Sequence, residues 1–340
     1  MDSEAKAAWR ACCRAAASDV YDATTALAFK RSKDNASCCM APDQLPTALL
    51  AKCPRLHQLR CTGLSTLQGL PPNITTLDLS RCECLTNLAP LHQLTSLSTL
   101  SMEGECECTA EQPQQLSVAL ERLPSLQHLQ LQRCADRWPK AAAATMYPVL
   151  ASLTNLQTLH VVGHHLSTDA VAGIAAALQN LPHLTHLTLR STYFGSQGAA
   201  ILAPDLAAIA AHSKLARLEL RCNWMRVRGA DALAPALVLL APSLSHLDLS
   251  ENALAPAGVA MLLPVLASMR RLTELHLAQN GCDEQAARAI ADILSRNNDT
   301  TDAADSTPVA LALGERRGHS STSVTVRTHE ASQPCVIVFY

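Results

Sequence analysis

The stretch LSHLDLSENAL, residues 244–254, constrains the fold of this chain more than any other. It follows the pattern L-x-x-L-x-L-x-x-N-x-L. Leu247 and Leu249 alternate with Asp248, which predicts a short strand with one buried face. Asn252 stands where the chain must turn, and its amide can satisfy backbone groups that the turn leaves unpaired. Because one such unit cannot bury its own apolar face, the pattern should recur.

The pattern occurs nine times, at intervals of 18 to 31 residues. Its first leucine-type position is held by Leu56, Ile74, Leu97, Leu126, Leu156, Leu184, Leu215, Leu244 and Leu272. This recurrence resembles the leucine-rich repeat family. The longer copies are similar to the ribonuclease-inhibitor-like type, and the two short copies before Leu97 to the plant or cysteine-containing type. The resemblance implies an α/β leucine-rich repeat solenoid of about nine repeats, a curved horseshoe with parallel strands on the concave face and helices on the convex face.

The repeats define the expected domains. Residues 46–296 form the leucine-rich repeat domain, and residues 1–45 precede it as a helical cap or F-box remnant. Residues 297–340 are predicted to be a disordered tail, because residues 297–323 are polar and low in core-forming side chains, although the final PCVIVFY is apolar. Only 3% of the residues are aromatic, so leucine and alanine must build the core of thin repeating layers.

The net charge and the length of the apolar segments limit which partners and which cellular compartment are expected. A net charge of −2 gives no overall attraction to nucleic acid or to an anionic membrane. No run approaches the roughly 20 apolar residues that span a bilayer, and the N-terminus has no apolar signal core. The 14 cysteines are therefore interpreted as reduced thiols, which predicts a location in the cytoplasm or the nucleus.

Residues 4–17, EAKAAWRACCRAAA, predict an alanine-rich helix with one apolar side. The helix resembles the last helix of an F-box in F-box/leucine-rich-repeat proteins, with Trp9, Arg10, Cys13 and Arg14 at the matching positions. That resemblance implies a Skp1-type adaptor as partner. An F-box has about three helices, and those that would precede this one are missing, so one interpretation is an N-terminally incomplete form. The alternative is a cap that covers the terminal layer of the solenoid.

The outward strand positions should form one continuous surface, because strand side chains alternate and neighbouring strands lie about 4.8 Å apart. The predicted partner-binding residues are His128, His160, His186, Arg190, Arg217, Glu219, Arg221, Trp224 and Asp248. The basic middle of this set favours an acidic or phosphorylated protein segment. Trp224 beside arginine is typical of interface hot spots. The alternative is that the arginines are solvated or paired with Glu219, and that Trp224 covers a turn.

Two C-x-C pairs raise the possibility of zinc: Cys82 with Cys84, and Cys106 with Cys108. Cys82 occupies the place that asparagine holds in other repeats, as Cys134 also does, which favours packing over metal binding. Histidines 128, 160, 186, 246 and 276 are predicted on the same face as possible metal ligands or pH-responsive groups. No row combines histidine, carboxylate and nucleophile, and no phosphate-binding glycine loop occurs. The sequence therefore predicts no enzyme, no metal and no cofactor.

The function predicted from the sequence is a protein–protein interaction scaffold. The F-box resemblance implies a substrate receptor of an SCF-type ubiquitin ligase. Two alternatives stay open: a regulator of a small GTPase, because the long repeats are also similar to those of Ran GTPase-activating proteins, and a structural component of a ciliary or other large assembly. The fold alone does not choose among these functions.

Overall fold

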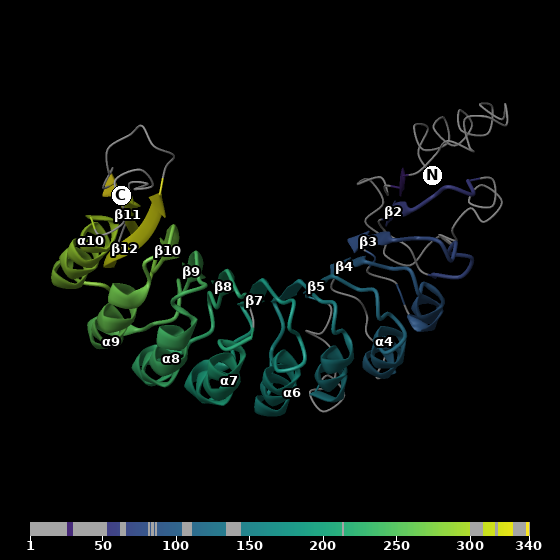
Figure 1. Cartoon of the computed structure of the whole chain (residues 1–340), viewed down its shortest axis with the longest axis horizontal. Helices are drawn as coiled ribbons and strands as arrows, with labels where there is room; N and C mark the ends of the chain where they lie inside the picture. The colour runs from purple at the N-terminus through teal and green to yellow at the C-terminus, as the bar shows by residue number, and fades with distance from the viewer. Residues whose placement is uncertain are drawn as a thin grey trace. The chain divides into compact units, whose positions relative to one another are not determined.

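The computed structural model describes residues 26–29, 53–61, 66–80, 82, 85, 87–103, 111–133, 144–212, 214–299, 309–316, 319–328 and 338–339 (Figure 1). The chain divides into two compact units, residues 1–158 and residues 159–340.

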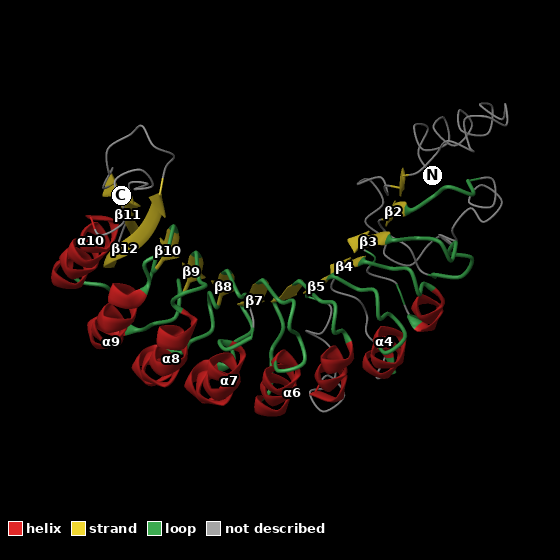
Figure 2. Cartoon of the chain, in the orientation of Figure 1, coloured by secondary structure: helices red, strands yellow, loops and turns green. Residues whose placement is uncertain are grey.

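The first unit holds parallel strands that follow one another in sequence order, with helical segments between some of them (Figure 2). Its strands are β1 (Ala26–Phe29), β2 (Gln58–Cys61), β3 (Thr76–Ser80), β4 (Thr99–Glu103) and β5 (His128–Gln132). Its helical segments are the 3-10 helix η1 (Ala89–Gln93), helix α4 (Gln112–Leu120) and the 3-10 helix η2 (Tyr147–Ser152).

Strand β6 (Thr158–Val162) begins at the last residue of the first unit, and from there strand and helix alternate regularly. The elements are α6 (Thr168–Leu178), β7 (His186–Arg190), α7 (Gly195–Ile209), β8 (Arg217–Glu219), α8 (Arg226–Leu240), β9 (His246–Asp248), α9 (Ala255–Ser268), β10 (Glu274–His276) and α10 (Glu284–Asp299). Strands β7 to β10 are parallel neighbours, and helices α7 to α9 lie side by side along one face of them (Figure 1). We call the opposite surface of β7–β10 the strand face.

Three more strands follow α10: β11 (Val309–Arg316), β12 (His319–Thr328) and β13 (Val338–Phe339). Strand β12 pairs antiparallel with β10 and with β11, and β13 pairs parallel with β11. They fall in the interval 297–340, for which the sequence predicts a disordered tail. The domain boundaries at residues 45 and 296 stay predictions.

The predicted fold class is confirmed: parallel strands alternate with helices in an α/β leucine-rich-repeat architecture. Among the described residues, each of the strands β2 to β10 begins two residues after the predicted first leucine of its repeat. The inward leucines form layers across the strands. Leu187, Leu218, Leu247 and Leu275 stand in register and are at most 1% exposed. Each such leucine contributes roughly 2 kcal/mol by leaving water.

A ladder of buried side chains closes each repeat of the second unit, at the turn after its strand. Equivalent places in successive repeats are held by His164, Thr192, Asn223, Asn252 and Asn280, all at most 1% exposed. These places are equivalent because the residue before each of them makes the same kind of backbone hydrogen bond. The amides of Ser191, Cys222 and Glu251 each donate to a carbonyl oxygen of the following repeat.

The asparagines of this ladder join one repeat to the next. The Oδ1 atom of Asn252 accepts from the backbone amide of Asn223, and that of Asn280 accepts from the amide of Asn252, both at 2.9 Å. The Nδ2 atom of Asn252 donates to the carbonyl oxygens of Leu220 and Leu249 at 2.8 and 2.9 Å. The prediction that Asn252 satisfies the backbone of the turn is confirmed. Its side chain serves two repeats at once.

His164 takes the asparagine place in the first ladder position, and burial lowers the pKa of its imidazole from 6.5 to about 3. The folded chain therefore keeps His164 neutral where the unfolded chain binds a proton. Because the unfolded state takes up that proton first, stability is unaffected above pH 6.5 and falls as the pH drops from 6.5 towards 3, by about 1.4 kcal/mol per pH unit.

Replacing His164 with asparagine should remove this contribution. Between pH 7 and pH 5, the free energy of unfolding of the wild type should fall by about 2 kcal/mol more than that of His164→Asn. Urea titrations followed by circular dichroism at both pH values measure the difference. The exposed neighbour His165, replaced by asparagine, is the control and should follow the wild type. Parallel curves for the wild type and His164→Asn would contradict the assignment.

Several sequence predictions lie outside the described residues. These are the helix over residues 4–17 with Trp9, Arg10, Cys13 and Arg14, and the cysteines Cys84, Cys106, Cys108 and Cys134. Cys82 is described: it is buried, and its thiol donates to the carbonyl oxygen of Cys61 at 3.4 Å. Burial raises the pKa of the Cys61 thiol to about 12, so that thiol stays protonated. Within the described ranges, no helix has both the length and the apolar character needed to cross a bilayer.

Candidate partner-binding surface

The register of β7 to β10 arranges the outward side chains of the strand face in two rows. The first row holds His186, Arg217, His246 and Glu274, and the second holds Thr188, Glu219, Asp248 and His276. Adjacent members of a row lie on neighbouring strands, which are about 4.8 Å apart in the direction of the hydrogen bonds between them. Within the rows, His246 and Thr188 are buried, and the others are partly exposed.

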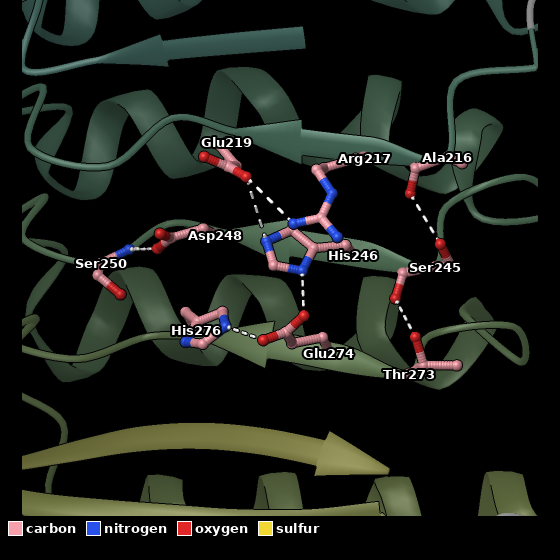
Figure 3. A network of polar contacts seen from close by, with 10 residues as sticks. All are labelled: Ala216, Arg217, Glu219, Ser245, His246, Asp248, Ser250, Thr273, Glu274 and His276. Atoms are coloured by element: carbon pink, nitrogen blue, oxygen red, sulfur yellow. Dashed lines mark hydrogen bonds and ion pairs between the residues drawn. The ribbon is translucent and has the colours of Figure 1, made fainter. Parts of the chain in front are cut away.

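A polar network links members of both rows (Figure 3). An Nη1 atom of Arg217 lies 3.4 Å from Oε1 of Glu219, which is also 3.6 Å from Nε2 of His246. The Nδ1 atom of His246 is 2.7 Å from Oε2 of Glu274, and Nε2 of His276 is 2.9 Å from Oε1 of the same carboxylate. Because Arg217 is paired with Glu219, its charge is largely balanced within the strand face.

Two pKa shifts follow from this packing. Burial lowers the pKa of His246, helped by the nearby charge of Arg217 and opposed by the carboxylates of Glu274 and Glu219. Burial alone would raise the pKa of Glu274, but the hydrogen bonds of His276 and His246 outweigh it and bring the pKa to about 2. Near neutral pH the network therefore holds a carboxylate at Glu274 beside an uncharged imidazole at His246.

The predicted basic middle is only partly available to a partner. Arg221 forms an ion pair with Glu251, and Arg217 is paired with Glu219, as the alternative interpretation proposed for the arginines. The side chain of Arg190 is exposed and makes no ion pair within the described part of the chain. Arg190 is the last residue of β7, and Arg221 follows the end of β8 by two residues. Their places are equivalent, since the amide of Gly163 donates to the carbonyl oxygen of Arg190 and that of Ser191 to the carbonyl oxygen of Arg221.

Two large aromatic side chains follow the buried ladder in successive repeats. Tyr193 is 44% exposed and Trp224 is 55% exposed. Both have left-handed backbones, with φ of 53° and 57°. The same place is held by Ala253 and by Gly281, also at positive φ. Glycine is the residue that adopts this conformation without steric cost, so an exposed tryptophan here is unusual.

A third ring precedes them. His165 holds the equivalent place one repeat earlier and stacks on Tyr193, with ring centroids 4.7 Å apart and an angle of 13° between the planes. We call His165, Arg190, Tyr193, Arg221 and Trp224 together the rim patch, because they lie at the end of the strand face where the strands enter the turns. It combines aromatic faces with guanidinium groups, the pair of chemistries found most often at interface hot spots.

The other predicted site residues lie apart from this patch or play a local part. His128 belongs to the first unit, where its Nδ1 atom is 2.8 Å from the hydroxyl of Thr158. His160 is half-buried on β6. The Nδ1 atom of His186 is 2.8 Å from the hydroxyl of Thr185, and Asp248 accepts from the backbone amide of Ser250 at 2.9 Å.

The sequence placed His246 and His276 on this face as possible metal ligands or pH-responsive groups, but it did not combine them with Glu274 and did not predict Tyr193 or His165 as site residues. An alignment of the repeats contains both signals. Tyr193 and His165 align with Trp224, one place after the ladder residue. Glu274 aligns with His246 in the next repeat and precedes His276 by two residues, which puts all three on one face of adjacent strands.

Comparisons with known proteins found one matching family model and several similar solved structures. A family model described as Leucine Rich repeat matches residues 241–263. Among solved structures, TLR13 in its complex with ssRNA13 is 19% identical over 70% of this chain and 30% of that chain, with a TM-score of 0.45. The leucine-rich repeat-containing protein LegL7 from Legionella pneumophila is 16% identical over 78% of this chain and 98% of that chain, with a TM-score of 0.42. No curated protein matches the sequence.

This chain thus spans less than a third of the TLR13 chain that it matches. The match to the family model falls on the repeat that contains β9 and the first part of α9. The repeats that surround it share the same strand starts and the same buried ladder. The described part of the chain is therefore a leucine-rich-repeat solenoid.

Proposed function

We propose that the protein is an interaction scaffold that binds a protein partner at the rim patch. The observation that carries the proposal is Trp224, which is 55% exposed while its backbone is left-handed. That conformation costs a non-glycine residue about 1 kcal/mol or more, and the exposed ring recovers little of it by burial. A partner that covers the ring supplies the missing burial.

The chemistry of the rim patch favours a polypeptide with acidic or phosphorylated groups. The exposed guanidinium of Arg190 can donate hydrogen bonds to a carboxylate or phosphate, and the rings of Tyr193 and Trp224 can pack against apolar side chains next to it. Nucleic acid fits less well, because binding along a phosphate backbone needs many unpaired cations. Here Arg217 and Arg221 are already paired, and the chain as a whole carries a net charge of −2.

Site-directed photo-crosslinking tests this surface. A photoreactive phenylalanine analogue replaces Trp224 in one version of the full chain and Leu239 in another. Leu239 lies on helix α8 and is equally exposed, at 55%, so it controls for non-specific capture. We expect a defined adduct from position 224 in cells that is missing from position 239. No adduct at 224, or the same set of adducts at both positions, would contradict the proposal.

The ubiquitin-ligase role is a finer version of the same proposal. It is supported by the resemblance of residues 4–17 to the last helix of an F-box, and it makes the protein bound at the rim patch a substrate. Size-exclusion chromatography of the full chain with a Skp1-type adaptor tests it, beside a version that lacks residues 1–30. A complex that is lost on deletion is the expected result. A well-folded chain that elutes apart from the adaptor would leave the scaffold without this role.

A further inference from the structure

We infer that His246, Glu274 and His276 form a binding site for one divalent cation of the zinc class on the strand face of the second unit. The site is separate from the rim patch and does not depend on the proposed function. None of the three residues belongs to that patch. The sequence placed His246 and His276 on this face as possible metal ligands or pH-responsive groups, but did not join Glu274 to them.

The backbone brings three ligand atoms together. His246 and Glu274 are register partners on β9 and β10, and His276 follows Glu274 by two residues on the same face. One imidazole nitrogen from each histidine and one carboxylate oxygen lie within 4.8 Å of one another. Ligand atoms around a tetrahedral zinc ion, with bonds of about 2.0 to 2.2 Å, lie about 3.4 Å apart. The hydrogen-bonded pairs at 2.7 and 2.9 Å need to open by only about half an ångström to match this spacing.

A neighbouring carboxylate supports the histidine that would bind the ion. The Oε1 atom of Glu219 lies 3.6 Å from Nε2 of His246, the nitrogen opposite the one that faces Glu274 (Figure 3). If Nδ1 of His246 coordinates a cation, its proton moves to Nε2, where Glu219 can accept it. Metal-binding histidines commonly donate their second nitrogen to a carboxylate in this way, which fixes the ring and its tautomer.

The surroundings also favour a cation. The network in Figure 3 holds three carboxylates, those of Glu219, Asp248 and Glu274, against the single guanidinium of Arg217.

The donor set and its exposure indicate what kind of ion would bind. Two imidazoles and one carboxylate suit zinc and its chemical relatives, whereas calcium and magnesium prefer oxygen ligands alone. The side chains of His246, Glu274 and His276 are 8%, 25% and 19% exposed, so the cluster is shielded but reachable. Three protein ligands leave a fourth coordination position for water or for a side chain of a bound protein.

Calorimetric titration of the full chain with zinc chloride tests the inference. We expect one zinc ion per chain, with an affinity that falls at least tenfold in His276→Ala and in Glu274→Gln. Glu219→Gln should weaken binding by about tenfold through loss of the second-nitrogen contact. His186→Ala is the matched control, because His186 stands in the same row of the strand face as His246 but is not one of the three proposed ligands. This variant should bind zinc with the affinity of the wild type.

Cobalt substitution separates this site from the 14 cysteines. Bound Co²⁺ should give the visible bands of a tetrahedral site without the near-ultraviolet charge transfer that thiolate ligands produce. Circular dichroism verifies that each variant is folded, and Glu274→Gln preserves shape if the alanine variant does not fold. An unchanged zinc affinity in Glu274→Gln, a thiolate band with Co²⁺, or no binding to the wild-type chain would each overturn the inference.

Discussion

Replacing Asn252 with alanine should lower the free energy of unfolding by about 3 to 5 kcal/mol, because a buried amide left without its acceptor costs about 1 to 3 kcal/mol and each further lost hydrogen bond about 1 kcal/mol. The variant leaves the backbone amide of Asn223 without its acceptor. It also removes one of two donors from each of the carbonyl oxygens of Leu220, Leu249 and Ser250. These oxygens keep the bonds from the side chains of Asn223 and Asn280 and from the amide of Cys222. The turn is buried, so water cannot replace these hydrogen bonds without opening the repeat.

Urea unfolding monitored by circular dichroism measures this loss. Asn252→Asp gives a second test, because it preserves the shape and the acceptor but places an oxygen where the carbonyl groups need a donor. Asn155→Ala is the control. Asn155 also donates to a carbonyl oxygen, that of Pro124, but it is exposed, and its loss should cost less than about 1 kcal/mol. Equal losses at positions 252 and 155 would mean that the ladder does not stabilise the repeats as described.

Replacing Trp224 with glycine should separate binding from folding. The affinity for the protein captured at position 224 should fall at least about 30-fold, the loss of roughly 2 kcal/mol that defines a hot spot. The free energy of unfolding should stay constant or rise by about 1 kcal/mol, because glycine takes the left-handed backbone without strain. Gly281 already holds the equivalent place two repeats later.

Calorimetric affinity measurements and thermal unfolding of the same samples test both halves of this prediction. Leu239→Ala removes an equally exposed side chain from helix α8 and should leave the affinity unchanged. If Trp224→Gly destabilises the chain and binds as well as Leu239→Ala, the ring covers a turn, as the alternative interpretation of the sequence proposed.

The solenoid could be predicted from the sequence because the leucine spacing within each repeat locates the strand of that repeat. Leucines at fixed spacing must face inward, so the first leucine of a copy locates the strand two residues later, as it does for Leu184 and β7. The rows of the strand face could be predicted for the same reason, since parallel strands of equivalent repeats pair without a shift. His246 and Glu274 were therefore already in adjacent positions.

The ion pairs, the burial and the turn conformations of the surface residues could not be predicted from the repeat pattern. Arg221 pairs with Glu251, which lies in the turn of the next repeat and belongs to no strand row. The burial of His246 depends on how its neighbours lean over it, and the left-handed backbone of Trp224 depends on the turn around Asn223. A one-dimensional pattern encodes periodicity and direction, whereas these features arise from side-chain packing between repeats.

The ladder of the second unit has a direction, and this bears on how such a chain can change its length. The buried amide of Thr192 bonds to the side chain of Asn223, that of Asn223 to Asn252, and that of Asn252 to Asn280. In an additional complete repeat, the side chain of its asparagine would accept a hydrogen bond from the backbone amide of the repeat before it. The backbone amide of the same asparagine would donate to the side chain of the repeat after it. Gene duplication of whole repeats can thus extend the array without leaving a buried amide unbonded, whereas inserting part of a repeat would interrupt the series.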